Sequence, residues 1–599
     1  MDPVTNPPSS SSPSTTIFLQ DACLQHKYIR TKDSSHIFER PERLRAVKIG
    51  LCAAMARLEE SLPVATSEPP RAEDSEADSL VAAIENLRLE QDSAELALPK
   101  GHPVQVVRSS AKVDILNHPA VKYVHGDVDG DVYPEKLVEW ARHSAEKISN
   151  GQSEIPTGLP QGDLYMCPTS LDAIQGALGT VCEAVDTIMK SPVPGSPEPP
   201  RSAFIAVRPP GHHCGEDTPC GFCFVNNVAV GAAHAHLKHG IRRIVILDID
   251  LHHGNGTQSI VWQINEEAYQ TRLAAEAGAP PKPGLHVYYG SVHDILSFPC
   301  EDGKPDKVQA ASVSIHGPHG QYIENVHFEP FESEEQFWDA HYRGAYSKLL
   351  SKAEDFVKST GGTSDDTLVF ISAGFDASEH ETPSMSRHNR KVPTSFFYRF
   401  TQDVCAFANK WAQGRIVSVL EGGYSDKALL SGAMAHLTGL VEGGRADTDH
   451  RSRENWWSPE NVQMLEKLAK KRRGPRSSLD AAADTKRPLW FDRTSALLTQ
   501  LDPHSSEQSL NSRGTFVPPS SMTLRARKPA SQGTPTSPDR KKAYQSHPVG
   551  DAVVAAAADA ADASSSLSSS ESTAPEIAPA AVAKKLPRVI LKVGPRPET

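Results

Sequence analysis

The segment Ile244-Val-Ile-Leu-Asp-Ile-Asp-Leu-His-His-Gly-Asn-Gly256 decides the fold of this chain and most of its chemistry. Its apolar first half is typical of a buried β-strand. The strand stops at a run of polar side chains: Asp248, Asp250, His252, His253 and Asn255. Side chains two apart on an extended backbone project to the same side, so Asp250 and His252 can bind the same metal ion. A carboxylate and an imidazole are common ligands of zinc, although Asp-x-His alone does not exclude an ordinary polar turn.

Further runs share this buried-strand character and alternate with helix-like segments such as Val228 to Lys238. The five runs are Ser202–Val207, Arg243–Leu247, Leu285–Tyr289, Thr367–Ile371 and Arg415–Leu420. Near-continuous β-branched hydrophobicity is expected of strands that are covered on both faces of a parallel sheet. The alternation therefore predicts an α/β fold with a central, mainly parallel β-sheet, flanking helices and right-handed crossovers.

Chemically competent residues follow each of these five runs. They are found in Arg208-Pro-Pro-Gly-His212-His213, in Asp248 to Asn255, in Gly290-Ser-Val-His-Asp-Ile-Leu-Ser-Phe298, in Ser372-Ala-Gly-Phe-Asp376 and in Glu421-Gly-Gly-Tyr424. Ligands of open α/β sheets bind beyond the carboxyl ends of the strands. We therefore expect the active site at this rim, with all five groups converging on it.

The predicted metal ligands are Asp250, His252 and Asp376, which leave positions open for water and substrate, as a catalytic zinc site requires. Two carboxylates and a neutral imidazole cancel the charge of a divalent ion. Such a centre activates water less than an all-histidine site, so an added base and an added electrophile are useful.

The tandem His212-His213 offers the base, and Asp248 and Asn255 are available to orient the two rings. Tyr424 offers the electrophile, because its phenol can donate a hydrogen bond to a carbonyl oxygen that becomes an oxyanion. The reaction class that these residues predict is metal-assisted hydrolysis of an amide.

The ordered motifs resemble the zinc-dependent histone deacetylase family, and most closely its class II type and a divergent group found in fungi. They are Pro-Pro-Gly-His-His, Gly-Phe-Cys-Phe-Val-Asn-Asn, Asp-Ile-Asp-Leu-His-His-Gly-Asn-Gly-Thr-Gln, Ser-Ala-Gly-Phe-Asp-Ala and Glu-Gly-Gly-Tyr. The resemblance covers about Ile17 to Gly443 and includes Arg40-Pro-Glu-Arg-Leu44. It implies a single arginase/deacetylase-like domain.

The resemblance also implies a role for each matching residue. Zinc would bind Asp250, His252 and Asp376; His213 would be the general base and acid, with His212 as its electrostatic partner; Tyr424 would polarise the acetyl carbonyl; and Gly221, Phe222 and Phe298 would line the acetyl-lysine channel. A potassium ion would bind the side chains of Asp248 and Ser291 and the backbone carbonyls of Asp250, His252 and Val292. The implied activity is hydrolysis of N6-acetyl-lysine in histone tails or other proteins, which releases acetate and regulates chromatin and transcription.

Two alternatives to this function stay open. One is a small-amide deacetylase acting on acetylpolyamines, which the acidic pair Glu301-Asp302 near Phe298 keeps open. A weakly active acetyl-lysine-binding scaffold is the other, although retention of Tyr424 argues for catalysis. One departure from the family is the loop Ser378 to His388, which replaces the usual Gly-Asp-Pro-Leu-Gly-Gly and leaves substrate preference undetermined.

The remaining His and Cys groups are interpreted as structural or surface residues and not as metal sites. Cys214, Cys220 and Cys223 could form a zinc knuckle, but the second Cys-x-x-Cys pair is missing. His234, His236 and His239 contain no i, i+4 pair, which favours a solvated surface over a metal site. His293 lacks a clear partner and is predicted to be structural.

Composition predicts a disordered N-terminus over 1–16, a catalytic domain over 17–450, a terminal helix and basic cluster over 451–476, and a disordered low-complexity tail over 477–599. The segments Ala65 to Ala97 and Glu266 to Gly284 are interpreted as surface insertions. Lys470-Lys-Arg-Arg-Gly-Pro-Arg476 predicts nuclear import, or else a charged helix end. The hydrophobic-basic motif Lys585 to Val593 predicts an unidentified protein partner.

The bulk numbers limit the remaining classes. The 599 residues carry a net charge of −12, which argues against direct binding of nucleic acid. No signal peptide is recognised and no apolar run approaches the roughly 18 residues of a membrane span. Nine cysteines, an odd number, favour free thiols in a reducing compartment. We therefore expect a soluble protein of the nucleus, with the cytoplasm as the second location.

Overall fold

The computed structural model describes residues 14–62, 98–99, 101–126, 133–194, 196–443, 450–469 and 487–502. The basic cluster Lys470 to Arg476, the motif Lys585 to Val593 and the segment Ala65 to Ala97 lie outside the described residues. The predictions made for them are therefore not addressed by the fold.

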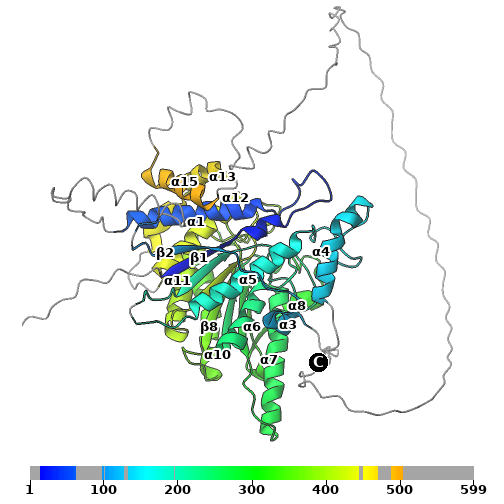
Figure 1. The fold of residues 1–599 in the computed structure, drawn as a ribbon. Coiled ribbons are helices and arrows are strands. Elements are labelled where there is room, and N and C mark those ends of the chain that lie inside the picture. Colours follow the sequence, from blue (N-terminus) through cyan, green and yellow to red (C-terminus); the bar gives the residue numbers. More distant parts are fainter. Residues whose placement is uncertain are drawn as a thin grey trace, which may run out of the picture. The chain divides into compact units, whose positions relative to one another are not determined.

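A mainly parallel sheet lies at the centre of the described residues (Figure 1). Its nine strands run in the order β2-β1-β3-β9-β8-β4-β5-β7-β6. Their bounds are β1 Thr15–Gln20, β2 Val104–Ser109, β3 Ser202–Ala206, β4 Arg243–Asp248, β5 His286–His293, β6 Ser314–His316, β7 Tyr322–His327, β8 Thr367–Ala373 and β9 Ile416–Leu420. Every pairing is parallel except that of β6 with β7. The predicted fold class is confirmed, and the five predicted strands are β3, β4, β5, β8 and β9.

Register in the middle of the sheet sets the positions of the functional residues. Asp248 at the end of β4 pairs with Ser291 of β5 and with Ser372 of β8. β4 and β8 therefore end at nearly the same level, which brings Asp250 and Asp376 to one rim. All residues of β8 are buried, because helices cover both faces of the sheet.

Helices connect and cover the strands. They are α1 Glu42–Glu60, α3 Pro119–His125, α4 Tyr133–Ser149, α5 Ser170–Ile188, α6 Asn227–His239, α7 Asn255–Glu276, α8 Pro305–Ala310, α9 Glu334–Gln336, α10 Lys348–Ser359, α11 Ser395–Trp411, α12 Asp426–Glu442, α13 Pro459–Ala469 and α15 Leu489–Leu501. Short 3-10 helices cover Asp21–Gln25, Pro318–Gly320 and His450–Trp457, and a π-helix covers Phe337–Tyr346. None of the helices in the described residues is long and apolar enough to span a bilayer.

The ends of the domain differ from the sequence prediction. β1 begins at Thr15 and buries Thr15 and Thr16, so these two residues belong to the sheet and not to a disordered N-terminus over 1–16. The prediction of a disordered tail from residue 477 is wrong over α15, because this helix buries Trp490, Phe491 and Leu497. It packs on α1, where Arg57 lies 4.1 Å from the ring centre of Trp490 and Arg493 donates to Glu59 at 2.7 Å.

Two further segments refine the prediction. α13 begins at Pro459, directly after Ser458, as predicted for the terminal helix. The supposed insertion Glu266 to Gly284 is in its first half the end of α7, which runs on to Glu276 and projects at the bottom of Figure 1. Proline after this helix marked its end and not the start of an insertion.

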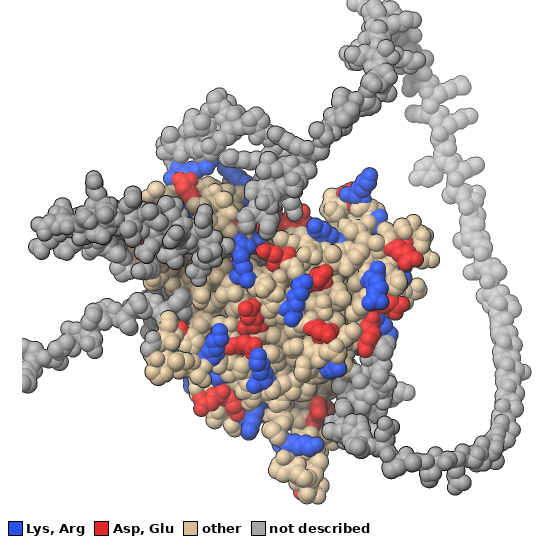
Figure 2. Space-filling view, viewed as in Figure 1, with Lys and Arg blue, Asp and Glu red and all other residues tan. Residues whose placement is uncertain are grey.

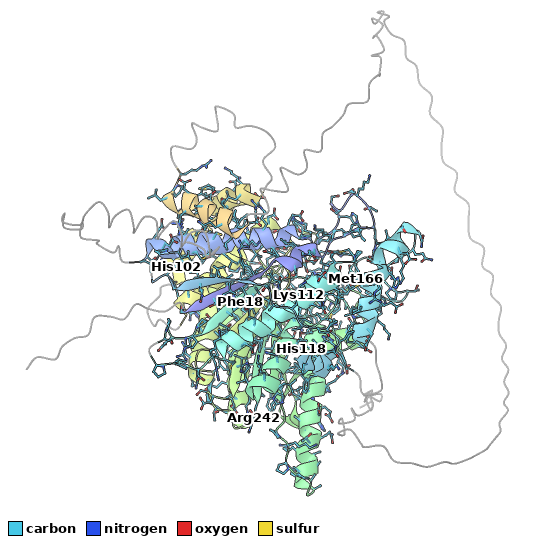
Figure 3. All side chains as sticks on the ribbon, viewed as in Figure 1. Phe18, His102, Lys112, His118, Met166 and Arg242 are labelled. Atoms are coloured by element: carbon cyan, nitrogen blue, oxygen red, sulfur yellow. The ribbon has the colours of Figure 1, made fainter. Side chains whose placement is uncertain are left out.

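On the face shown in Figure 2, basic and acidic side chains of the described residues are interspersed. Figure 3 shows the same face with side chains drawn, and its labels place Lys112 and His118 near α5 and α6. Both residues line one pocket on this face.

Candidate metal centre and active site

Asp250, His252 and Asp376 meet at the carboxyl ends of β4 and β8, and their ligand atoms all lie within 4.8 Å of one another. We call these three residues the rim cluster. Nδ1 of His252 lies 3.2 Å from Asp250 Oδ1 and 3.0 Å from Asp376 Oδ2. All three side chains are buried. The structure thus brings together the three metal ligands predicted from the sequence.

Backbone groups hold both carboxylates in place. The Gly422 N–H donates to Asp250 Oδ2 at 2.8 Å, and the Leu251 N–H donates to Asp376 Oδ1 at 2.8 Å. A side chain at Gly422 would not fit, since its Cβ would lie 2.3 Å from Asp376 Oδ2. Glycine at this position lets the β9 loop pass directly behind the carboxylates.

The charge of the rim cluster fits a divalent cation. Burial disfavours a charged His252, but the carboxylates of Asp376 and Asp250 outweigh burial and raise the pKa of this imidazole to about 10. The two buried carboxylates therefore require positive charge beside them. Two carboxylate ligands and one imidazole would hold a transition metal and leave coordination positions for other molecules.

His212 lies behind the rim cluster and is held by Asp248. Its Nδ1 lies 3.2 Å from Asp248 Oδ2, which also accepts a hydrogen bond from the Tyr289 hydroxyl at 3.1 Å. Burial opposes a charge on His212, but Asp250 and Asp248 raise its pKa to about 10. The His212 side chain is therefore positively charged.

His213 has the opposite electrostatics. Its Nδ1–H donates to Asn255 Oδ1 at 2.8 Å, and its ring centre lies 4.0 Å from that of His212. Burial, followed by the charges of His212 and His252, lowers the pKa of His213 well below its ordinary value. The ring is neutral, and because Nδ1 carries the proton, the lone pair is on Nε2. Asp248 and Asn255 thus occupy the orienting positions expected from the sequence.

Tyr424 is anchored through its backbone. Its N–H donates to Glu381 Oε2 at 2.8 Å, and the guanidinium of Arg43 lies 4.9 Å from the ring centre. Burial raises the pKa of Tyr424 well above its ordinary value, so the phenol keeps its proton. A buried, protonated phenol is a hydrogen-bond donor.

The predicted channel residues gather around His213 and Tyr424. The Phe298 ring lies edge-on to His213 at 4.9 Å, and the Phe222 ring lies 5.6 Å from Tyr424. Both phenyl groups are partly exposed. Gly221 has φ 49°, and a Cβ there would lie 2.4 Å from the His213 ring, so only glycine leaves room for this ring.

Sequence reasoning missed three buried groups that position this machinery. Glu421 Oε2 accepts the N–H groups of Gly211 and His212 at 2.7 and 3.1 Å. Burial raises the pKa of Glu421 to about 7. Arg43 donates to the carbonyl of Gly423 at 2.7 Å and also to that of Glu421. Glu381 is the third, and it comes from the loop in which the chain departs from the family.

That loop, Ser378 to His388, is tied to the channel at both ends. His388 Nδ1 lies 2.8 Å from Asp294 Oδ2, four residues before Phe298. Glu381 also accepts the Ser425 N–H at 3.0 Å. The position of Glu381 in an atypical loop was the only available signal, and it did not indicate what the carboxylate would bind.

The remaining predictions have mixed outcomes. Ser291 Oγ contacts His293 Nδ1 at 2.9 Å, and His293 Nε2 contacts the carbonyl of Ala311 at 3.0 Å. His293 is thus buried with partners on both nitrogens, in keeping with a structural role. Among the described residues, the clusters that could hold a metal do not include Cys214, Cys220 and Cys223. The solvated-surface interpretation is wrong for His234, which is buried and bonded to Asp186.

Comparison with known proteins agrees with this geometry. The model of the histone deacetylase domain family matches residues 110–440, which is more than half of the chain. A nine-stranded, mainly parallel sheet with two carboxylates, an imidazole and a tandem His at its rim defines the class, and the chain belongs to the histone deacetylase family.

Two of the individual relatives are histone deacetylases of Saccharomyces cerevisiae and Dictyostelium discoideum. Over 325 residues the chain is 40% identical to Histone deacetylase HOS3 of Saccharomyces cerevisiae, covering 52% of this chain and 46% of the relative. It is 28% identical to Type-2 histone deacetylase 1 of Dictyostelium discoideum, over 47% of this chain and 20% of the relative. The chain thus spans less than half of the length of these curated relatives. The crystal structure of the HDA15 HD domain aligns with a TM-score of 0.45 at 21% identity, covering 76% of this chain and 99% of that one.

Proposed function

We propose that this chain hydrolyses N6-acetyl-lysine in histone tails or other proteins, with zinc bound by Asp250, His252 and Asp376. The observation that carries the proposal is the rim cluster with a neutral His213 and a protonated Tyr424 beside it. Bound zinc would supply Lewis-acid activation of the water and the amide carbonyl.

The side chains of the rim perform the proton transfers. Nε2 of His213 takes a proton from the attacking water and returns it to the amine of the leaving lysine, so one ring serves as base and then as acid. Asn255 fixes the tautomer that leaves Nε2 free. The charged His212 behind the ring keeps His213 from being protonated before the reaction starts.

Tyr424 stabilises the oxygen that gains charge. Its hydroxyl donates to the acetyl carbonyl as this becomes an oxyanion, which is worth roughly 2.7–4 kcal/mol for one donor. Phe222 and Phe298 beside it would hold the methylenes of the lysine stem, at about 0.8 kcal/mol for each buried methylene. Because Gly221 has no side chain, the rings of His213 and Phe298 can lie beside it.

The structure weakens the argument for polyamine substrates. Of the two acidic residues near Phe298, Asp302 pairs with Lys304 at 2.9 Å and with Lys307 at 3.1 Å. Its charge is therefore compensated. We keep protein substrates as the proposal, and acetylpolyamines serve as the comparison substrate.

The decisive experiment measures deacetylation of an acetylated histone-tail peptide by the purified chain and by Tyr424→Phe. We expect activity that is lost on chelation and restored by zinc, and at least about a hundredfold lower kcat/KM in the variant. Tyr322→Phe is the matched control, because it also removes one tyrosine hydroxyl. That hydroxyl contacts Ser359 at the end of α10. Turnover of acetylpolyamines without turnover of the peptide would overturn the choice of substrate.

The domain bounds, the import signal and two further binding sites are proposed from the sequence, with α15 added from the structure. We propose 17–450 as the catalytic domain, extended by α15, and Lys470 to Arg476 as a nuclear import signal. Neutralising Lys471 to Arg473 should move a tagged protein to the cytoplasm, and unchanged location would contradict this. We also propose that Asp248 and Ser291 bind potassium and that Lys585 to Val593 binds a protein partner.

A further inference from the structure

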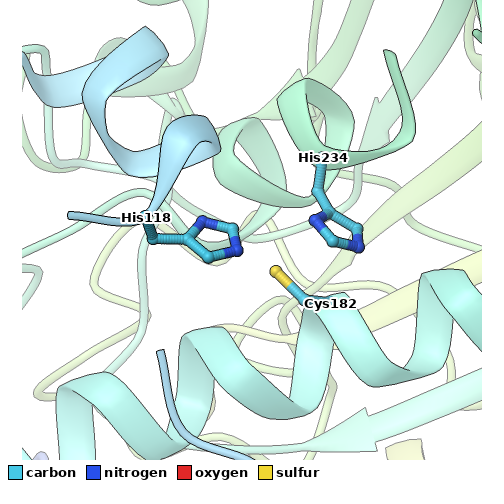
Figure 4. Close-up of side chains that lie close together, drawn as sticks. All are labelled: His118, Cys182 and His234. Carbon is cyan, nitrogen blue, oxygen red and sulfur yellow. The ribbon is translucent and has the colours of Figure 1, made fainter. Parts of the chain in front are cut away.

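A second group of metal-competent side chains lies away from the rim. His118 directly precedes α3, Cys182 is in α5 and His234 is in α6, and their ligand atoms all lie within 4.8 Å of one another. In Figure 4 the Cys182 sulfur points between the two imidazole rings. We call these three residues the helix-face cluster. It shares no residue with the rim cluster.

The helix-face cluster is also separated from the rim along α6. Helix α6 starts at Asn227, close to the channel residues Gly221 and Phe222, and His234 comes seven residues later. At 1.5 Å per residue the two are roughly 10 Å apart along the axis. The cluster is therefore a site apart from the rim cluster and does not contact atoms that react there.

Asp186 orients His234 in the way that carboxylates orient metal-binding histidines. Asp186 Oδ1 lies 2.9 Å from Nε2 of His234 and 2.7 Å from Nε2 of His239. With the Nε2 proton donated to Asp186, the neutral His234 ring has its lone pair on Nδ1. Such a partner fixes the tautomer and increases the basicity of the ligand nitrogen.

The backbone of His118 is hydrogen-bonded to Asp114 and Lys122, but its imidazole is not fixed through Nδ1. Its Nδ1 is buried and has no hydrogen-bond partner among the described residues. Its ring stacks on that of His234 with the centres 5.6 Å apart. Buried ring nitrogens are normally bonded, so an imidazole that instead faces another imidazole and a thiol is better explained by a shared ligand.

The cluster is accessible to ions from solution. His118, Cys182 and His234 line a pocket of about 580 Å³, together with Asp186. The pocket also includes Lys112, and Lys112 and His118 are labelled on the same face in Figure 3. The opening leaves room for water as a fourth ligand, which completes the tetrahedron that zinc prefers.

We propose that His118, Cys182 and His234 form a second metal site, for zinc or a similar thiolate-binding divalent transition metal. Two imidazoles and one thiolate suit zinc, whereas magnesium and calcium prefer oxygen ligands. Binding releases the proton of the Cys182 thiol to solvent, because the thiolate is the ligand. Since the ligands come from α5, α6 and the residue before α3, the ion would join three segments and stabilise the folded chain.

Cobalt substitution tests the site independently of activity. The full-length chain, stripped of metal, is titrated with Co²⁺, and we expect two equivalents to bind. One of them should produce the near-ultraviolet charge-transfer band of a cobalt–thiolate bond, which the rim cluster cannot produce because it contains no sulfur. A single equivalent, or two equivalents without this band, would overturn the proposal.

Variants assign the band to its ligands. Cys182→Ser should abolish the band and one equivalent of metal, and His118→Gln, at a partly exposed position, should weaken binding of the same ion. Cys405→Ser is the matched control, since Cys405 is another buried free thiol, and it should leave the band unchanged. A band that persists in Cys182→Ser, or that disappears in Cys405→Ser, would contradict the assignment. His118→Gln guards against a folding defect in Cys182→Ser.

Discussion

The rim cluster and the helix-face cluster are built from similar side chains in different ways. In the rim cluster each ligand lies within a few residues of a strand end, and backbone N–H groups hold both carboxylates. In the helix-face cluster the ligands lie on or beside three helices, and a side chain, Asp186, orients one of them. Oxygen donors beside a base and a phenol suit a reaction, whereas a thiolate beside no other catalytic group suits a structural ion.

The largest expected difference between the clusters concerns activity. Asp376→Asn should lower kcat/KM on an acetyl-lysine peptide by on the order of a thousandfold, because it removes a ligand of the proposed zinc. Cys182→Ser should stay within about twofold of the parent, since the two clusters share no residue. Steady-state kinetics on the peptide checks both. Similar losses in the two variants would show that the clusters depend on each other.

The orienting residues sharpen the comparison. Asn255→Ala should reduce kcat by about ten- to hundredfold, because the His213 ring loses the partner that fixes its tautomer. Asp186→Asn should weaken the affinity of the helix-face cluster for cobalt, also by about ten- to hundredfold. Asp186→Asn should leave kcat unchanged. Asn409→Ala, at an exposed position of α11, is the control for both measurements. An effect of Asp186→Asn on kcat alone would contradict the separation of the two sites.

A buried histidine outside both clusters has a smaller effect, seen in stability. His436 is bonded to Thr401 and Ser418, each at 2.7 Å, and burial lowers its pKa to about 3. The unfolded value is about 6.5. Because the folded pKa is the lower one, the contribution of neutral His436 to the free energy of unfolding is complete above about pH 6.5. It is lost as the pH falls toward 3.

His436 alone should therefore lower the free energy of unfolding by about 2 kcal/mol between pH 6.5 and pH 5. Urea denaturation at several pH values measures this slope. In His436→Gln the decrease in the free energy of unfolding between pH 6.5 and pH 5 should be smaller by about 2 kcal/mol, even if the variant is less stable at pH 7. An unchanged slope would show that His436 is not neutral in the folded chain.

The rim was predictable because strand ends are predictable. Asp250 and His252 share an extended segment, and Asp376 and Tyr424 each follow a hydrophobic run, so parallel pairing alone brings them to one edge. Glu381 and Arg43 were not predictable in this way. Glu381 reaches the Tyr424 N–H from a loop, and Arg43 reaches the β9 loop from α1, and neither position has a sequence period that indicates its target.

The C-terminal helix shows a different kind of error. The low-complexity character of the chain beyond residue 477 outweighed the short apolar pattern of Leu489 to Leu501 in the prediction. That pattern has Trp490, Leu497 and Leu501 on one face, and the structure buries all three. The signal was present, but a single amphipathic helix requires a partner surface, and only the fold reveals that α1 provides it.

By itself, the sequence determined the α/β class, the parallel strands and the residues of the rim cluster, because hydrophobic periodicity and strand-end chemistry are local properties. Only the tertiary structure decided that α15 joins the domain, that Glu381 anchors Tyr424 and that His118, Cys182 and His234 meet. These contacts join residues from 43 to 116 positions apart, or from opposite ends of the domain, through the packing of helices and loops. Packing of that kind depends on the shapes of whole surfaces, and no local pattern in the chain specifies it.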